Sequence, residues 1–472
     1  MFESTWGSLK QYQCPDWFRD AKFGMWAHWG PQSVPMAGDW YARNMYIEGN
    51  PQYDHHCRTY GHPSEFGYKD IVQLWKAENW EPEKLIDLYK SAGAKYFVSM
   101  AIHHDNFDLW SSTHHAWNAT KIGPKRDVVG EWAKAARAAG LRFGVSEHLE
   151  RTYSWFNTNK GADISGPYAG VPYDGNDASM VDFYIEKHDD TSMCYPNNPG
   201  DVWPQHWKSR ILDLIDQYQP DLLYTDGGVP FGEVGREMIA HLYNNSVQQR
   251  GQLDAVYAVK NPRRHEGNHG DYVDGFATLD IERGVVEGIA EEPWQTDTCL
   301  GGWFYDSLRP YKTPETVIHM LADIVSKNGC LLLNATQRPD GTLDEQSEWT
   351  VKEIGKWIEV NGKAIYETRP WKQFGEGPTA FATSTKAESE ARQFTGEDFR
   401  FTAKDDTLYA IAMGKPSRGG WLIRSLESEK VSTASVLGTK YTNWRNTPEG
   451  LWVESPTKWP CEHAWGIEIH TD

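Results

Sequence analysis

The chain has 472 residues, of which 39% are hydrophobic and 13% aromatic, so it can form a sizeable core and is not an intrinsically disordered protein. Lys and Arg number 47 against 66 Asp and Glu, and the resulting net charge of −19 repels nucleic acids and anionic membrane surfaces, so we expect neither as a partner. The 6 cysteines lack metal-ligand spacing and therefore predict neither a zinc site nor a disulfide framework.

Strand-like and helical segments alternate over the first three quarters of the sequence. The segments that read as strands are 23–28, 95–102, 141–147, 221–226, 255–260, 276–282, 294–298 and 330–334. Amphipathic helices are predicted at 82–92, 127–139, 204–218, 233–249 and 313–327. This alternation predicts a (β/α)8-like barrel, which we expect to be irregular at 260–276 and 282–294 because no helix is evident there.

Two regions depart from this alternation. Residues 149–203 are rich in Gly, Pro, Asn and Asp, and we interpret them as an insertion that forms a wall of the substrate site. After a predicted helix at 345–360, short alternating strands separated by turn residues predict a C-terminal β-sandwich. We therefore expect a barrel domain at 1–365 and a sandwich domain at 366–472.

The predicted strands end in unusually polar sequences. Active sites of such barrels lie at the carboxyl ends of the strands. These ends carry AHWG with His28, IHHD with His103 and His104, SEHLE with Glu147 and His148, YTDGG with Asp226, and LDIERG with Glu282. Such His and carboxylate groups, with nearby Trp side chains, suit the binding of sugar hydroxyls and the stacking of a sugar ring. Adjacent residues of a strand point to opposite faces, so His103 and His104 can both face the site only if a bulge intervenes.

Asp226 is the strongest candidate for a reacting group. It follows the apolar run DLLY and precedes two glycines, and the predicted helix at 233 begins too late for Asp226 to be its cap. Glu282 ends another strand in the same way, with Asp280, Glu287, Glu291 and Glu292 as nearby alternatives. Most enzymes that hydrolyse a glycosidic bond use two carboxyl groups that face one pocket.

Seven motifs, in order, resemble the α-L-fucosidases of glycoside hydrolase family 29, over roughly residues 15–372. They are KFGMWAHWGPQSVPMAGDWY, AIHHDNFDLW, SEHLE, DLLYTDGG, PWQTDTCLGGWFY, LLLNATQRPDGTL and VNGKAIYETRPW. The resemblance implies a retaining exo-hydrolase of terminal α-L-fucose, built as a barrel followed by a β-sandwich, with no metal and no organic cofactor. It implies that Asp226 is the nucleophile and Glu282 the acid/base, and that His28, Trp40, His103 and His104 hold the sugar.

The sequence departs from the family pattern near the expected sugar. Asp39 stands where the family commonly has Glu, and Glu147 and His148 where it often has Tyr or Trp. We expect Glu147 and His148 to contact the sugar or the leaving group, and Trp294 to add an aromatic wall. These departures leave α-L-galactose open as an alternative sugar, because a hydrophobic pocket rejects an added hydroxyl only about 100-fold.

Two other classes of function stay open from the residues alone. One is a metal-dependent hydrolase using His103, His104, Asp226 and His148, although no HxH or HExxH spacing is present. The other is a carbohydrate-binding protein without turnover. The expected partner is a fucosylated oligosaccharide or polysaccharide, and a homo-oligomer is left open. A removed signal peptide would leave no trace, so the location is periplasmic or secreted if one was removed and otherwise cytoplasmic.

Overall fold

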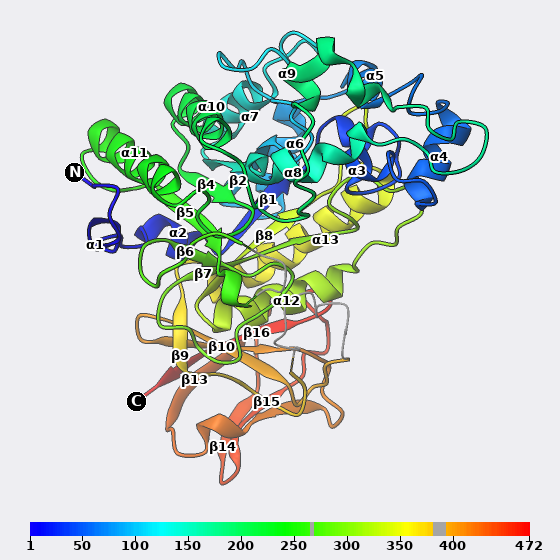
Figure 1. Ribbon diagram of the computed structural model, residues 1–472. Coiled ribbons are helices and arrows are strands. Elements are labelled where there is room, and N and C mark those ends of the chain that lie inside the picture. The colour runs from blue at the N-terminus through cyan, green and yellow to red at the C-terminus, as the bar shows by residue number, and fades with distance from the viewer. Residues whose placement is uncertain (265–268, 381–392) are drawn as a thin grey trace.

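The computed structural model describes residues 1–264, 269–380 and 393–472. Eight parallel strands close into a barrel in chain order, with β8 pairing back onto β1 (Figure 1). The strands are β1 (Phe23–Ala27), β2 (Tyr96–Ile102), β3 (Arg142–Glu147), β4 (Leu222–Thr225), β5 (Val256–Lys260), β6 (Thr278–Asp280), β7 (Trp294–Cys299) and β8 (Gly329–Asn334). The predicted (β/α)8-like barrel is confirmed.

The longer helices cover the outside of the barrel and begin where the sequence supplies capping groups. Side chains of Asp127, Thr313 and Asp344 accept backbone N–H bonds at three helix starts. The longer helices are α6 (Pro82–Ser91), α7 (Val128–Ala138), α10 (Val202–Tyr218), α11 (Glu233–Arg250), α12 (Pro314–Ser326) and α13 (Glu345–Asn361). Shorter ones are α1 (Trp6–Leu9), α2 (Asp16–Ala21), α3 (Tyr41–Asn44), α4 (Pro51–Thr59), α5 (Tyr68–Leu74), α8 (Thr152–Trp155) and α9 (Val181–Tyr184).

The barrel is irregular on one side, as the sequence predicts. In the described residues, the connection from β5 to β6 contains only the 3-10 turn Pro262–Arg264, and the connection from β6 to β7 contains no helix. β6 itself has three residues instead of the seven expected. In the described residues, loops and not α-helices therefore connect the strands on this side of the barrel.

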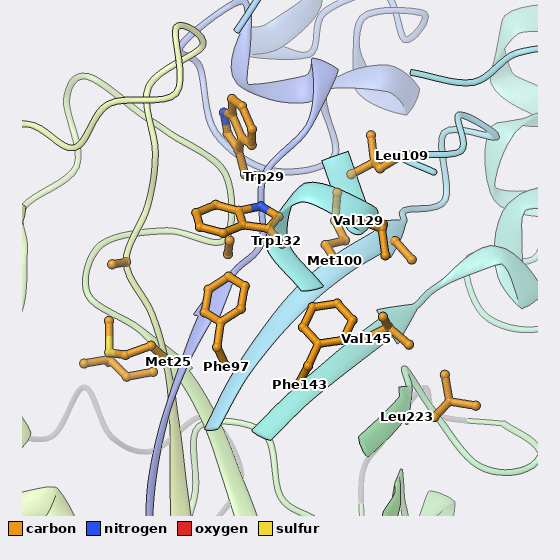
Figure 2. Close-up of a cluster of buried hydrophobic side chains, with 14 of the residues drawn as sticks. Met25, Trp29, Phe97, Met100, Leu109, Val129, Trp132, Phe143, Val145 and Leu223 are labelled. Carbon is orange, nitrogen blue, oxygen red and sulfur yellow. The ribbon is translucent and has the colours of Figure 1, made fainter. Parts of the chain in front are cut away.

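Alternate residues of the strands fill two separate cores. Phe97 of β2 and Phe143 of β3 face outward toward α7, where the ring centroids of Phe97 and Trp132 lie 4.6 Å apart (Figure 2). Trp26, Tyr224 and their neighbours form a second buried cluster, which fills the barrel interior. Because the interior is packed, a ligand cannot lie inside the barrel and would have to bind at one of its two ends.

The C-terminal strands form two antiparallel sheets with a common core, the predicted β-sandwich. One sheet has the order β13-β16-β11-β10-β9 and the other β12-β15-β14. Their bounds are β9 (Arg369–Glu376), β10 (Phe399–Lys404), β11 (Thr407–Ala412), β12 (Gly420–Ile423), β13 (Val431–Val436), β14 (Trp444–Thr447), β15 (Gly450–Glu454) and β16 (Trp465–Thr471). α12 of the barrel packs against β9 and β10, so it lies between the two parts (Figure 1).

The insertion at 149–203 is a folded wall of short helices and turns, including α8 and α9. Trp155 and Phe156 are fully buried and join its first helices to the core cluster around the barrel. In the described part of the chain, no helix combines the length and apolar character that a membrane span requires.

Candidate active site

A cavity of about 440 Å³ lies at the carboxyl ends of the barrel strands, a size within the range of small-ligand sites. Residues at or just after the ends of β1 to β7 line it, together with two loops and the insertion. The lining includes Trp26, His28, Asp39, Trp40, His103, His104, His148, Arg151, Met193, Cys194, Tyr224, Asp226, Lys260, Glu282, Arg283, Asp297, Trp303 and Arg309.

Seven of the nine residues predicted for the site line this cavity. They are Asp226, Glu282, His28, Trp40, His103, His104 and His148. Glu147 and Trp294 do not. The insertion contributes Arg151, Met193 and Cys194, so it does form part of the cavity wall.

His103 and His104 both face the cavity because the strand that precedes them is irregular. The register of β2 against β3 shifts between Met100 and Ile102, and β2 ends at Ile102. The two histidines therefore follow a bulge and are not held to strict alternation. Their ring centroids lie 4.2 Å apart.

Glu147 points away from the cavity, which corrects the expectation that it contacts the sugar or leaving group. It is fully buried and accepts hydrogen bonds from Thr225 Oγ1 at 2.8 Å, Trp207 Nε1 at 3.1 Å and the backbone N–H of Leu149 at 3.1 Å. Because Trp207 belongs to α10, Glu147 faces the outer layer while its neighbour His148 faces the cavity.

Trp294 lies at the wrong end of the barrel, so the predicted aromatic wall is also corrected. It is the first residue of β7, whereas the cavity lies beyond the last residues of the strands. Its indole N–H donates to the carbonyl of Lys327 at 2.9 Å, and only 1% of the residue is exposed. Trp303, after β7, lines the cavity instead.

Asp226 and Glu282 are connected through a buried lysine. Nζ of Lys260 lies 2.6 Å from Oδ1 of Asp226 and 2.9 Å from Oε2 of Glu282. The sum of these distances, about 5.5 Å, is the largest separation that the two carboxylate oxygens can have. The two candidate reacting groups therefore face one another across a short gap.

Asp226 is held in its ionised form. Burial alone would raise its pKa, but Arg151, Lys260 and His148 outweigh burial and hold the pKa well below its usual value. Nη2 of Arg151 and Nδ1 of His148 each lie 3.4 Å from Oδ2. The next residue, Gly227, has φ +143°, and a Cβ there would lie 2.4 Å from Tyr195 Oη, so the turn that presents Asp226 requires glycine.

Hydrogen bonds fix which ring nitrogens of two histidines carry a proton. Gln32 Oε1 accepts from the Ala42 N–H at 3.2 Å, so its amide Nε2 donates to Nδ1 of His103 at 2.8 Å, which leaves the proton of His103 on Nε2. Nδ1 of His104 donates to the carbonyl of His148 at 2.6 Å, which leaves Nε2 of His104 as an acceptor. Burial lowers the pKa of both rings, so both are neutral.

His28 and His148 supply further polar atoms. Both residues are buried, and among the described residues neither ring nitrogen of His28 has a hydrogen-bond partner. Nδ1 of His148 faces Asp226, whereas its Nε2 has no partner among the described residues. Buried polar atoms are normally satisfied, so these nitrogens fit a ligand that brings its own hydroxyl groups. Together with His103 and His104, they can offer both donors and acceptors to such a ligand.

The same histidines could in principle hold a metal ion. Ligand atoms of His103, His104 and His148 lie within 4.8 Å of one another, as do those of His28, Asp39 and His103. In His103, however, Nδ1 is occupied by Gln32 and Nε2 carries the proton, so neither nitrogen has a free lone pair. The arrangement therefore suits hydroxyl groups better than a metal ion.

Sequence reasoning missed Lys260 and Arg151. A lysine at a strand end is ordinarily read as a solvent-facing residue, and Arg151 lies in a segment without strand or helix periodicity. The only available clue to Lys260 was its place at the end of a predicted barrel strand, the same rule that found Asp226 and Glu282.

The chain is similar in sequence and fold to known α-L-fucosidases. A profile of the family described as "Alpha-L-fucosidase" matches residues 1–363. The plasma α-L-fucosidase of Homo sapiens is 29% identical over 99% of this chain and 92% of its own length, and the tissue α-L-fucosidase of the same organism is 26% identical over 99% and 91%. The crystal structure of Thermotoga maritima α-fucosidase in complex with fucose is similar with a TM-score of 0.76 and 26% identity, covering 99% of this chain and 100% of that one.

Proposed function

Because the chain belongs to the α-L-fucosidase family and is a glycoside hydrolase, we propose that it releases terminal α-L-fucose from glycans with retention of configuration at the anomeric carbon. In this proposal Asp226 is the nucleophile and Glu282 is the acid/base. The proposed substrate is a fucosylated oligosaccharide or polysaccharide.

The carboxylate separation is the observation that carries the proposal. Retaining glycosidases place their two carboxyl groups about 5–5.5 Å apart, whereas inverting enzymes leave about 6.5–9.5 Å for an attacking water. Lys260 keeps one oxygen of Asp226 and one of Glu282 within about 5.5 Å of each other, and this close approach supports the retaining class.

The reaction then proceeds in two displacements. Ionised Asp226 attacks the anomeric carbon while Glu282 gives its proton to the glycosidic oxygen, so the bond to the leaving alcohol breaks and a fucosyl ester forms on Asp226. In the second step Glu282 takes a proton from water, whose oxygen attacks the anomeric carbon and breaks the ester. Fucose leaves, and both carboxyl groups regain their starting protonation states.

The histidines would hold the ring hydroxyls in both steps. Nε2–H of His103 can donate a hydrogen bond to a sugar oxygen, and Nε2 of His104 can accept one from a sugar hydroxyl. One histidine therefore binds an acceptor and the other a donor. The faces of Trp40 and Trp303 offer apolar surface for the C–H groups of the pyranose.

The test is the substitution Asp226→Ala, assayed on an aryl α-L-fucoside. We expect turnover to fall by at least about 10³-fold, because no ester can form. Added azide should restore turnover and yield the β-fucosyl azide, since azide enters from the face that the nucleophile has vacated. Asp216→Ala removes an exposed aspartate that pairs with His241 on α11, and it should leave turnover unchanged. Near-normal turnover of Asp226→Ala would refute the assignment.

The same assay separates the alternatives. Glu282→Ala should lose far less activity on a fucoside with a good leaving group than on one with a poor leaving group, because only the latter needs a general acid. Faster hydrolysis of the matching α-L-galactoside would favour that sugar. Loss of activity with EDTA and recovery with zinc would favour a metal at the histidine cluster.

A further inference from the structure

Lys260 touches both candidate reacting groups. It is the last residue of β5, and 2% of it is exposed. Its backbone N–H donates to the carbonyl of Gly227 at 2.8 Å, which ties it to the turn that presents Asp226. The ammonium is therefore fixed between β4 and β6 by both its backbone and its side chain.

A buried ammonium needs a carboxylate partner, because an unpaired buried charge is costly. The carboxyl groups that face Lys260 include Asp226 just after β4, Asp280 at the end of β6, Glu282 two residues later, and Asp297 of β7. Burial raises the pKa of Asp280 to about 6 and that of Asp297 well above its usual value, so both bind a proton more readily than an ordinary aspartate. Asp226 and Glu282 are the carboxylates that Lys260 contacts directly.

The proposed reaction moves one negative charge between these two contacts. In the free enzyme Asp226 is ionised and Glu282 carries the proton. In the fucosyl-enzyme Asp226 is a neutral ester and Glu282 has become the carboxylate. Each of the two carboxyl groups keeps an oxygen at hydrogen-bond distance from the same ammonium.

We propose that Lys260 is a positioning residue that pairs with whichever of the two carboxylates is ionised, Asp226 before the first displacement and Glu282 after it. The ammonium keeps its proton throughout, so the net charge of the cavity is the same in the free enzyme and in the covalent intermediate. This inference rests on the proposed function and extends it, because it gives one side chain the same charge-pairing role in both displacements.

The pH dependence of kcat/KM distinguishes this role from a structural one. Its acidic limb reports ionisation of Asp226 and its alkaline limb reports deprotonation of Glu282. Asp226 also faces Arg151, His148, His104 and Lys260, and Glu282 faces Lys260, Asp39, Asp280 and Asp297. Removing the ammonium should raise the pKa of both reacting groups, so both limbs should move to higher pH. A structural defect would lower the whole profile without moving it.

The experiment compares Lys260→Met and Lys260→Arg with the wild type on an aryl α-L-fucoside. For Lys260→Met we expect both limbs to move up by about one pH unit or more and kcat to fall at least about 10-fold. Lys260→Arg keeps the charge and should keep the limbs near their wild-type positions, with a lower kcat because its planar fork fits the two carboxylates differently. Unmoved limbs in a folded Lys260→Met protein would overturn the inference.

Two controls separate the possible failures. Lys327→Met removes another buried lysine, which pairs with Asp323 away from the cavity, and it should leave both limbs in place. Mass spectrometry of the wild type after 2-deoxy-2-fluoro-fucosyl fluoride should show the label on Asp226. A labelled wild type with unmoved limbs in Lys260→Met overturns only the role of Lys260. A wild type that neither hydrolyses fucosides nor takes the label overturns the proposed function and this inference together.

Discussion

Asp39 is a third carboxyl group of the cavity, and its surroundings oppose its ionisation. Burial, with Glu282 and Asp226 nearby, raises its pKa to about 7 despite the hydrogen bond that it accepts from the Trp40 N–H at 2.8 Å. As a neutral acid Asp39 could donate a hydrogen bond to a sugar oxygen, whereas as a carboxylate it only accepts. A small change of pH near neutrality therefore changes what this residue offers a ligand.

This shift has a consequence for stability. The pKa of Asp39 is higher in the folded protein than the usual value of about 3.9, so its proton stabilises the fold at low pH, and that contribution is lost as pH rises from about 4 through 7. Asp39→Asn should therefore raise the free energy of unfolding more at pH 8 than at pH 5, by about 1 kcal/mol after allowing for partial exposure. Urea unfolding at the two pH values measures this, and an equal effect at both would contradict it.

At the scale of the elements, the alternation of apolar and polar residues was sufficient to locate the strands and helices. β3 and α11, for example, lie within one residue of their predicted ends. β6 is the exception, because it pairs at three positions with β5 and at two with β7. Sequence alternation shows which residues favour a strand, but the length of the paired ladder depends on neighbours that are distant in the chain.

Most of the cavity residues that the sequence predicted are those at the carboxyl ends of strands, where active sites of such barrels lie. This strand-end rule found Asp226, Glu282 and the histidines, but it says nothing about the direction of a side chain, and so it wrongly included Glu147. Trp294 was wrongly placed because it begins a strand instead of ending one. Lys260 was missed because its two partners lie just beyond the ends of β4 and β6, and only closure of the barrel brings them to it.

The first α-helix of the insertion packs against residues that line the cavity. Trp155 ends α8, and its ring centroid lies 5.7 Å from that of Trp40 and 5.1 Å from that of His104. Trp40 has φ +64°, which is uncommon for a bulky residue and needs support from its surroundings. Arg43 donates a short hydrogen bond to the carbonyl of Trp155, which fixes the helix end.

We therefore expect Trp155→Ala to affect binding as well as stability. Loss of this fully buried side chain should cost about 3–5 kcal/mol, and KM for an aryl α-L-fucoside should rise more than kcat falls, because Trp40 and His104 lose their support. Trp132→Ala is the matched control, since Trp132 is equally buried but lies between α7 and the barrel wall (Figure 2). It should lose similar stability with KM unchanged, and equal changes of KM in the two variants would refute the supporting role.

For the molecule as a whole, a buried group of charges joins the barrel to the sandwich. Asp323 of α12 accepts a hydrogen bond from Nε of Arg400 on β10, and its other oxygen lies 2.9 Å from Nζ of Lys327. All three side chains are at most 2% exposed. One carboxylate thus neutralises two cations where α12 meets the β9 side of the sandwich.

Because one carboxylate serves two cations, the loss of each of the three charges should have a different effect on the free energy of unfolding. Asp323→Leu leaves two buried cations without their carboxylate and should cost about 3–5 kcal/mol of the free energy of unfolding. Arg400→Met leaves Asp323 paired with Lys327, so its cost should be clearly smaller. In the Arg400→Met background, Asp323→Leu should cost less than in the wild type, because only one cation is then left unpaired.

Urea unfolding of the two single variants and of the double variant measures these changes in the free energy of unfolding. Glu348→Gln on α13 is the control. Glu348 pairs with Lys352 at the surface, where an ion pair contributes about 0–1 kcal/mol, so its loss should change little. Because Asp323 and Arg400 do not line the cavity, the folded variants should keep the kcat of the wild type at low temperature. An Arg400→Met variant as unstable as Asp323→Leu would show that the guanidinium, packed between Phe374 and Phe394, joins the two parts through its contacts and not through its charge.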